Sequence, residues 1–267
     1  MSNDKSTSKS SKNAAREAAA AARKQAESAE KRRDRMIKII GGLVVLGLVG
    51  GIIAAAVITK TNKDNANKPN ASHASPAGVD TTTYGYVVNS KAPTTGIPQV
   101  QLWEDFQCPV CKQFEDSGSA AALQDAAKAN QINLQLRPTT FLDQNLGNDA
   151  SQLATNAWGC AINENKALEY HKGIFAMQPE KEGEGYTQEQ LLTLGEQVGL
   201  TGDPLSNFQS CVKGNNFNGW VANSQAQFEA DKVSGTPTLI VNGKTLDNKD
   251  GVYYKPQELL AAIKAAA

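Results

Sequence analysis

The chain has 267 residues and balanced charge, with 27 Lys and Arg against 27 Asp and Glu. The balance hides two halves of opposite sign: residues 1–78 carry 14 basic and 6 acidic side chains, and residues 79–267 carry 13 and 21. Halves that differ this much indicate two regions in two environments. The acidic second half gives no reason to expect a nucleic-acid partner.

The basic half contains a long apolar segment that predicts a membrane anchor. Residues 39–58 form a run of 20 residues without a charged side chain. As a helix this run spans roughly 30 Å, the thickness of the hydrocarbon core of a bilayer. Basic residues precede it, so residues 36–58 are expected to cross the membrane once with the N-terminus in the cytoplasm. The alternative, a cleaved signal peptide, has a short basic region and an apolar run of about 7–15 residues. An uncleaved signal-anchor is therefore favoured.

The segments on either side of this anchor have the composition of solvated chain. Residues 1–35 are rich in Ala, Lys, Glu and Ser and lack an apolar stripe, which predicts a basic cytoplasmic tail. Residues 59–80 are polar and contain Pro, Asn and Ser, which predicts an extracytoplasmic linker. The folded domain is then expected at residues 81–267, a length ample for a single core. In this arrangement the protein belongs to the cell membrane and its folded domain lies outside.

Within the folded domain, hydrophobic periodicity predicts strands near both ends and helices between them. Strands are expected at residues 84–88, 98–106 and 132–138, with a helix that begins at Pro109 between the last two. Residues from about 146 to 232 contain several helical patterns broken by Gly and Pro. A turn signal at Asn242 and Gly243 then joins two strands, and a final helix follows. This order indicates an α/β domain with a central mixed sheet.

The start of the first domain helix carries a pair of cysteines, in the stretch EDFQCPVCKQFED at residues 104–116. A disulfide exchanger requires one thiolate that attacks and one thiol that resolves. Cys108 falls at the helix start, where unpaired N–H groups and the helix dipole stabilise a thiolate. Cys111 lies one turn further on the same face, so the two sulfurs can bond. Pro109 keeps the first turn regular and Val110 offers no hydrogen bond to sulfur, so both are expected to tune the redox properties of the pair.

Two other interpretations of this motif are weaker. A structural zinc site needs four Cys or His ligands, usually in two close pairs. Only one close pair is present, His73 falls in the predicted linker and His171 stands alone, so no metal is expected. His171 is interpreted as a surface or satisfied helical histidine rather than a base. The remaining alternative is a buried structural disulfide between Cys108 and Cys111.

Cys160 and Cys211 form a second candidate pair, within two of the helical patterns. The chain has 4 cysteines, and an even number in an exported domain indicates pairing. A structural disulfide between Cys160 and Cys211 is therefore favoured over two free thiols. Neither residue lies at a helix start of the kind that activates a thiolate, so no catalytic role is expected for them.

Two stretches together resemble the DsbA-like branch of the thioredoxin superfamily. They are DFQCPVCKQFE at residues 105–115 and GTPTLIVNG at residues 235–243, and the resemblance covers about residues 98–265. It implies a thioredoxin fold with a helical insertion between its βαβ and ββα halves, here preceded by one transmembrane helix. It also implies a cis peptide bond between Thr236 and Pro237, packed against the disulfide, where the Thr236 backbone pairs with an extended substrate chain. The layout of tail, anchor and linker is similar to that of membrane-anchored actinobacterial relatives.

The chain departs from this family pattern in two places. Thioredoxin-like sites often have a buried acid six residues before the first cysteine, as a proton relay for the resolving thiol, and that position here is Leu102. Glu104 or Asp105 can substitute, and because strand alternation turns only one of them inward, we expect Asp105. The strongest oxidants of the family have a His between the cysteines, where this chain has Val110. The direction of the reaction is therefore left open.

The resulting functional hypothesis is a membrane-anchored thiol–disulfide oxidoreductase that introduces disulfides into exported proteins. Cys108 exchanges with substrate thiols and Cys111 resolves the mixed disulfide, without a cofactor. The expected partners are exported proteins with free thiols and a membrane protein, VKOR- or DsbB-like, that reoxidises the pair. The alternatives are an extracytoplasmic disulfide reductase or isomerase, and a non-catalytic binding module or chaperone on the same scaffold. Retention of both cysteines argues against the binding module.

Overall fold

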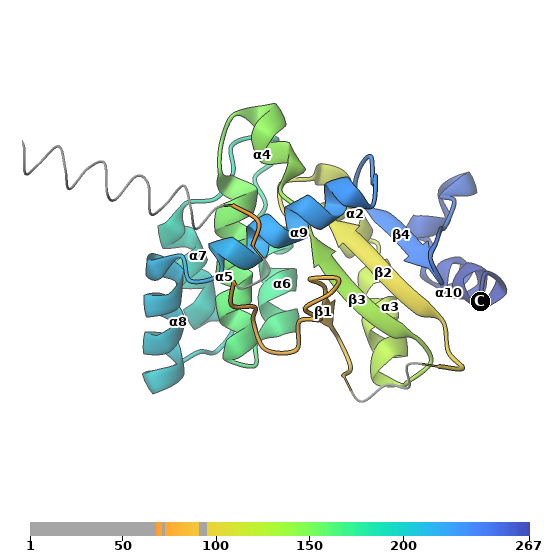
Figure 1. Ribbon diagram of the computed structural model, residues 1–267, viewed down its shortest axis with the longest axis horizontal. Helices are drawn as coiled ribbons and strands as arrows, with labels where there is room; N and C mark the ends of the chain where they lie inside the picture. Colours follow the sequence, from red (N-terminus) through yellow and green to blue (C-terminus); the bar gives the residue numbers. More distant parts are fainter. Residues whose placement is uncertain (1–67, 71–72, 91–94) are drawn as a thin grey trace, which may run out of the picture. The chain divides into compact units, whose positions relative to one another are not determined.

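The computed structural model describes residues 68–70, 73–90 and 95–267 (Figure 1). The predicted tail and anchor, residues 1–58, lie outside the described residues, so both stay predictions. Among the residues that are described, no helix is both long and apolar enough to cross a bilayer.

The described strands and helices follow the predicted order of a βαβ half, a helical block and a ββα half. Along the chain they are β1 (Tyr86–Val87), β2 (Gln99–Glu104), α2 (Pro109–Asp116), α3 (Ser119–Lys128), β3 (Asn133–Pro138), α4 (Phe141–Leu146), α5 (Ala150–Asn163), α6 (Ala167–Ala176), α7 (Gln188–Gln197), α8 (Gly202–Gly214), α9 (Asn218–Ala230), β4 (Thr238–Val241), β5 (Lys244–Thr245), the 3-10 helix η1 (Lys249–Tyr254) and α10 (Pro256–Ala265). The insertion therefore comprises α4 to α9.

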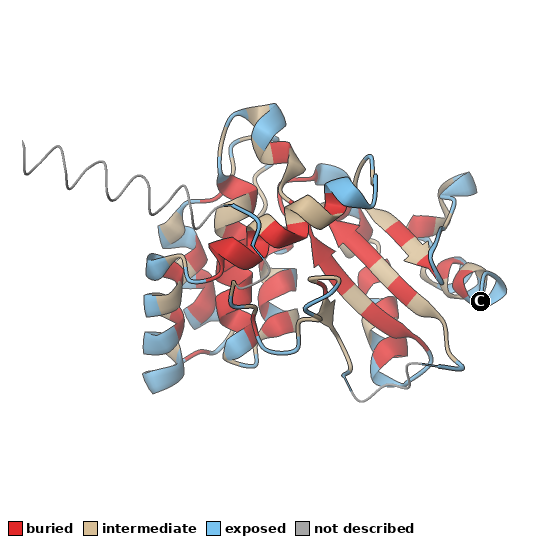
Figure 2. Cartoon of the chain, viewed as in Figure 1, coloured by how far each residue is buried: buried red, intermediate tan, exposed pale blue. Residues whose placement is uncertain are grey.

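The strands form one mixed sheet in the order β1-β3-β2-β4-β5. β2 runs parallel to β3 and antiparallel to β4, and Leu102 in its centre pairs with Leu136 on one side and Leu239 on the other. All three of these leucines are buried, and Figure 2 shows buried residues along the middle of the sheet. The predicted mixed sheet is confirmed.

The two faces of the sheet are covered by different helices. Helix α9 crosses one face, and α3 lies behind the sheet in the view of Figure 1. Trp103 points to the α9 face, where its ring meets Phe228 edge-on with 5.3 Å between centroids. The guanidinium of Arg137 lies 3.9 Å from the centre of the Trp103 ring. Because side chains alternate along a strand, Leu102 and Glu104 point to the opposite face.

The insertion is built around α5, which contacts α4, α6, α7, α8 and α9. Its small residues permit this close approach, and most of the helix is buried, whereas the outer surface of α8 is exposed (Figure 2). A disulfide joins Cys160 on α5 to Cys211 on α8. The disulfide thereby links α8, whose outer surface is exposed, covalently to the central helix α5.

Part of the predicted linker packs on the folded domain. The backbone N–H of Asn70 donates to Oδ1 of Asn223 on α9 at 2.7 Å, and the Asn223 amide donates back to the Asn70 carbonyl at 2.9 Å. The imidazole ring of His73 lies so close to Gly219 that a Cβ there would clash with it. The described part of the predicted linker is thus held on the domain, because α9 provides the amide of Asn223 as a hydrogen-bonding partner and a glycine surface that the His73 ring can approach closely. We call residues 68–70 and 73–80 the docked segment.

Candidate active site

Cys108 is the N-cap residue of α2, with extended backbone angles, and Pro109 occupies the first turn. The turn that leads from β2 into this helix is closed by a hydrogen bond from the Cys108 N–H to the Asp105 carbonyl at 2.9 Å. Cys111 follows one turn along the helix and is fully buried. Both cysteines are free thiols in this structure. The local fold therefore presents one sulfur at the open end of a helix and the other beneath it.

The surroundings of the two sulfurs separate their proton affinities. The pKa of Cys108 is lowered to about 6, chiefly because the Cys111 thiol donates a hydrogen bond to it, with help from Thr236 and the backbone N–H groups of Val110 and Cys111. Burial opposes this effect. The pKa of Cys111 is raised well above its ordinary value, first by burial and then by its bond to Cys108 and the negative charge there. At neutral pH the reduced pair therefore holds one thiolate and one thiol, the division that disulfide exchange requires.

The loop before β4 lies against the reactive sulfur. The peptide bond between Thr236 and Pro237 is cis. The Cys108 thiol approaches the Thr236 carbonyl at 3.4 Å, so this loop and the helix start meet at one point of the molecule. Val110 lies beside them and exposes 43% of its surface. The edge of the site thus offers backbone groups and one apolar side chain to an extended chain, the combination that strand-like peptide recognition uses.

Glu104, and not only Asp105, is turned inward next to the cysteines. β2 ends at Glu104, so the chain turns there and strand alternation no longer governs Asp105. The Asp105 carboxylate accepts hydrogen bonds from the Ser151 hydroxyl at 2.5 Å and from the backbone N–H of Gln107 at 2.9 Å, and burial raises its pKa to about 7. Glu104 has its pKa raised well above the usual range by burial and by the charge of Cys108. Its own charge also raises the pKa of Cys111.

Glu104 is therefore the acid that is electrostatically linked to both sulfurs, whereas Asp105 holds the turn that precedes them. A role for Asp105 in redox tuning stays a prediction. The alternation of β2 places Glu104 on the same face as Leu102, the position at which the family pattern puts its acid. That signal is present in the sequence and favours Glu104.

His171 is buried beside Glu104, which sequence reasoning did not anticipate. It comes from α6 of the insertion, and its Nε2 lies 3.2 Å from a carboxylate oxygen of Glu104. Its Nδ1 lies 3.7 Å from a carboxylate oxygen of Glu115 on α2. The three side chains bring one donor atom each to within 4.8 Å of one another, a separation that suits a metal ion. The two carboxylates, however, face opposite nitrogens of the imidazole ring. A single metal ion can bind only one of these two nitrogens, so it cannot sit between His171 and both carboxylates at once.

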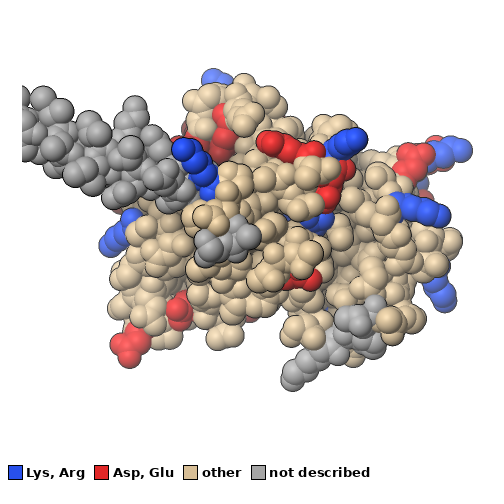
Figure 3. Space-filling view, viewed as in Figure 1, with Lys and Arg blue, Asp and Glu red and all other residues tan. Residues whose placement is uncertain are grey.

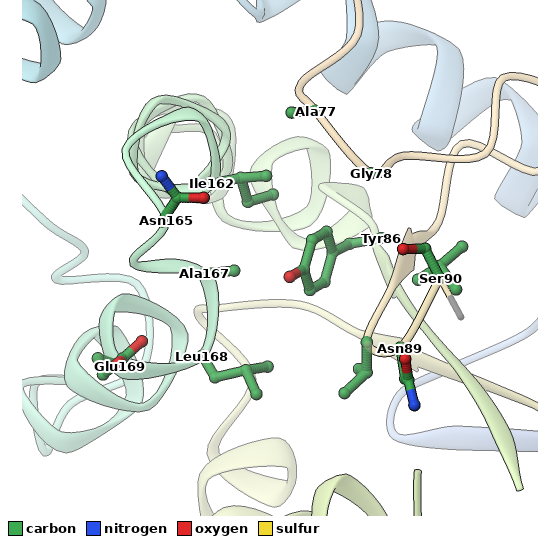
Figure 4. A pocket seen from close by; sticks show the side chains of 12 residues that line it. Ala77, Gly78, Tyr86, Asn89, Ser90, Ile162, Asn165, Ala167, Leu168 and Glu169 are labelled. Carbon is green, nitrogen blue, oxygen red and sulfur yellow. The ribbon is translucent and has the colours of Figure 1, made fainter. Parts of the chain in front are cut away.

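A hollow among the described residues lies apart from the cysteine pair. The hollow in Figure 4, of about 550 Å³, lies between Tyr86 on β1 and the start of α6, where Leu168 and Glu169 line it. Neither Cys108 nor Cys111 lines it. On the face drawn in Figure 3, acidic and basic side chains are interspersed rather than gathered by sign. The cysteine site is thus separate from this hollow.

A sheet of this order, with a Cys-x-x-Cys pair at the helix after β2 and a cis-proline loop before β4, defines a thioredoxin-fold dithiol protein. A family model described as thioredoxin matches residues 82–265. The chain belongs to this family.

Solved structures with the same fold support this assignment. MdbA, a thiol-disulfide oxidoreductase from Actinomyces oris, matches with a TM-score of 0.58 and 20% identity over 73% of this chain and 98% of that one. Oxidised BdbD from Bacillus subtilis matches with a TM-score of 0.56 and 19% identity, over 72% of this chain and 97% of BdbD. Reduced DsbG from Mycobacterium tuberculosis, a disulfide bond oxidoreductase, matches with a TM-score of 0.51 and 22% identity, over 67% of this chain and 86% of DsbG. No curated protein sequence shows a significant match.

Proposed function

We propose that this chain is a protein thiol–disulfide oxidoreductase that oxidises the thiols of exported proteins. The observation that carries the proposal is the position of Cys108 at the start of α2, against the loop of the cis Thr236–Pro237 bond and above the buried Cys111 thiol, where its pKa is lowered to about 6. MdbA from Actinomyces oris, which shares the fold, is a thiol-disulfide oxidoreductase.

In the proposed reaction a substrate thiolate attacks Cys108 in the disulfide form of the pair. The bond between Cys108 and Cys111 breaks, and Cys111 leaves and takes up a proton. A second substrate thiolate then attacks the substrate sulfur of the mixed disulfide, and Cys108 leaves as a thiolate. Two electrons pass from the substrate sulfurs to the pair. Thr236 offers its backbone to the extended substrate beside Cys108, and Pro237 shapes that loop.

The stability of the Cys108 thiolate supports the oxidising direction. Stabilising a thiolate favours the reduced form of the pair, so its disulfide becomes a stronger electron acceptor. We expect a potential above the value of about −270 mV that is typical of thioredoxin. The side chain of Val110 donates no hydrogen bond to the Cys108 sulfur, and the charge of Glu104 opposes a thiolate there, so we expect a potential below that of the strongest oxidants.

We further propose that residues 39–58 anchor the protein in the membrane with the thioredoxin domain outside the cell. The apolar run and the basic residues before it support this topology. An exported oxidase needs an electron acceptor, so a membrane protein of the VKOR or DsbB type is proposed to reoxidise the pair.

Two cysteine variants test the function with a reduced, unfolded protein as substrate. Cys108→Ser should abolish disulfide formation, whereas Cys111→Ala should accumulate mixed disulfides because the resolving thiol is gone. The matched control is the double variant Cys160→Ala and Cys211→Ala, which removes two cysteines elsewhere and should retain exchange. Wild-type protein that reduces disulfides but does not form them, with a potential at or below about −270 mV, would replace the oxidase by a reductase.

A further inference from the structure

The loop that contains the cis peptide bond is short and joins α9 to β4. Residues 232–237 separate Asp231, which follows the last residue of α9, from Thr238, the first residue of β4. Figure 1 shows this loop leaving the end of α9 and entering β4. The Thr238 hydroxyl donates a hydrogen bond to the Gly235 carbonyl at 2.7 Å. We call residues 232–237 the cis-proline loop, and because it is short, its position depends on how its two ends are held.

Both ends of the cis-proline loop are held on one residue of the sheet, Trp103. At the β4 end, Thr238 pairs with Trp103 in the antiparallel ladder of β2 and β4. At the α9 end, Nη1 of Arg137 donates a hydrogen bond to the Asp231 carboxylate at 2.8 Å. The Arg137 guanidinium in turn lies over the Trp103 ring, 3.9 Å from its centre. One end of the loop is thus held by the Trp103 backbone, and the other is held through the Trp103 ring.

The guanidinium of Arg137 is buried, so its pairing with Asp231 is hard to replace. The Arg137 side chain is 2% exposed and that of Asp231 is 30% exposed. Nη1 also donates to the Gln101 side chain at 2.7 Å, whereas Nε and Nη2 have no hydrogen-bond partner in the described part of the chain. Asp80 acts on Arg137 through its charge. Removing the partner of a buried charge is strongly destabilising, so the ion pair opposes movement of Asp231 away from the sheet.

Asp231 is also fixed from the side of the helix. Its backbone N–H donates to the Gln227 carbonyl at 2.8 Å, and the Gln227 amide donates to its Oδ1 at 2.7 Å. Phe228 on the same helix meets the Trp103 ring edge-on. The end of α9 and the end of β2 therefore pack together, and the cis-proline loop starts from this packed region.

The loop connects this ion pair to the reactive sulfur. Thr236 lies five positions after Asp231, and its carbonyl is 3.4 Å from the Cys108 sulfur. We propose that Arg137 and Asp231 are positioning residues, which hold the Thr236 backbone where an extended substrate chain pairs with it beside Cys108. This inference rests on the proposed function. In this role the ion pair acts on the substrate through Thr236 and takes no part in the transfer of electrons.

A positioning role predicts that polypeptide substrates and small thiols respond differently. A polypeptide uses the Thr236 backbone as an extended partner, so misplacing that backbone weakens its binding. Dithiothreitol has no peptide backbone, and its thiolate reduces the disulfide by direct attack at Cys108. Loosening the ion pair should therefore impair the reaction with a peptide and leave the reaction with dithiothreitol intact.

The test is the turnover of the full-length chain with a reduced peptide that contains two cysteines, with glutathione disulfide as the oxidant. Asp231→Asn removes the carboxylate charge and keeps the size of the side chain. The KM for the peptide should rise about tenfold, the size of effect expected when one hydrogen bond to a charged group is lost, while kcat is unchanged. The rate constant for reduction of the disulfide by dithiothreitol, measured separately, should also be unchanged.

Two further variants make the comparison specific to this ion pair. Asp231→Glu keeps the charge and lengthens the side chain, so its KM for the peptide should lie between those of the wild type and Asp231→Asn. Glu258→Gln removes the same charge from the exposed pair with Lys255 and should leave the KM unchanged. If Asp231→Asn does not fold, as judged by its melting temperature, the KM of Asp231→Glu decides the question.

Two results would overturn the inference while leaving the proposed function intact. One is a wild-type KM for the peptide in the Asp231 variants. The other is an equal fall in the rates with the peptide and with dithiothreitol, which means that the ion pair acts on the sulfurs or on the fold as a whole. A wild-type protein that dithiothreitol reduces but that does not oxidise the peptide would instead overturn the proposed function, and the inference with it.

Discussion

At the scale of single residues, the reactivity of the site depends on which of two adjacent sulfurs keeps a proton. The Cys108 pKa is lowered from an ordinary value of 9.0 to about 6, and that of Cys111 is raised. Alkylation of the reduced protein should therefore occur at Cys108 alone, with a midpoint near pH 6. Labelling with iodoacetamide over a pH series, followed by mass spectrometry of the peptide, measures this. A midpoint near pH 9, or equal labelling of both cysteines, would contradict the assigned environment.

The residues of the site differ in how readily the sequence reveals them. Cys108, Cys111 and the Thr236–Pro237 loop belong to short motifs whose chemistry depends on neighbours only a few positions away. The inward position of Glu104 could be predicted from the sequence, because Glu104 lies on the same strand face as Leu102. The position of His171 could not be predicted, because it depends on how α6 of the insertion packs against the end of β2. Glu104, at that end, lies 67 positions before His171 in the chain. Contacts of that range leave no periodic trace in a single sequence.

At the scale of elements, Asp105 connects the turn before α2 to the start of the insertion. Its carboxylate bonds the Ser151 hydroxyl on α5 and the Leu142 backbone N–H on α4. Its pKa in the folded protein, about 7, lies above the ordinary value of 3.8. The folded state therefore binds the proton more tightly than the unfolded state, so the stabilisation is complete below pH 3.8 and is lost as the pH rises through 7.

Asp105→Asn should consequently flatten the fall in stability between pH 4 and pH 7. The carboxyl group contributes up to about 1.4 kcal/mol per pH unit to this slope, and an amide does not titrate. Thermal unfolding of the oxidised protein over this pH range measures the effect. Asp125→Asn, at a side chain that is 78% exposed, is the control and should leave the slope unchanged. Equal slopes in Asp105→Asn and the wild type would show that the buried carboxyl does not titrate in this range.

The disulfide between α5 and α8 should contribute to stability without taking part in exchange. Cys160 and Cys211 are 51 residues apart, and closing a loop of this length stabilises the folded state by about 4 kcal/mol in the chain-entropy model. The double Ala variant should therefore unfold at a lower urea concentration. Its rate of disulfide exchange at Cys108 should stay near that of the wild type. Loss of exchange in a variant that remains folded would give this pair a redox role.

Element boundaries moved where tertiary contacts, rather than periodicity, decide them. The strand predicted at residues 84–88 is reduced to Tyr86–Val87, because only that part pairs with β3. The strand predicted at residues 98–106 ends at Glu104, where the chain turns toward the Cys108 helix start. The helical block predicted from about residue 146 begins with α4 at Phe141. In each case the order and type of the elements were predictable and the end points were not.

At the scale of the whole molecule, the proposed topology predicts how the protein behaves on intact cells. A protease added outside should remove the thioredoxin domain, because the chain beyond Thr59 is proposed to lie there. An antibody tag at the N-terminus should remain attached to a short protected fragment. Permeabilised cells, in which both sides are accessible, provide the control. Protection of the domain on intact cells would reverse the proposed orientation and with it the assignment of exported substrates.

The docked segment shortens the stretch of predicted linker that could separate the domain from the proposed anchor. Asn70 and His73 contact α9, and Ala77 bonds to Asn163 of α5, so at most residues 59–67 of the predicted linker separate the domain from the proposed anchor. Nine residues reach at most about 30 Å when fully extended, whereas the 22 residues of an undocked linker would reach more than twice as far. If residues 39–58 anchor the chain as proposed, this length is the upper limit on the separation between the membrane surface and residue 68. Under that proposal, the enzyme would be limited to polypeptides and redox partners that come near the membrane surface.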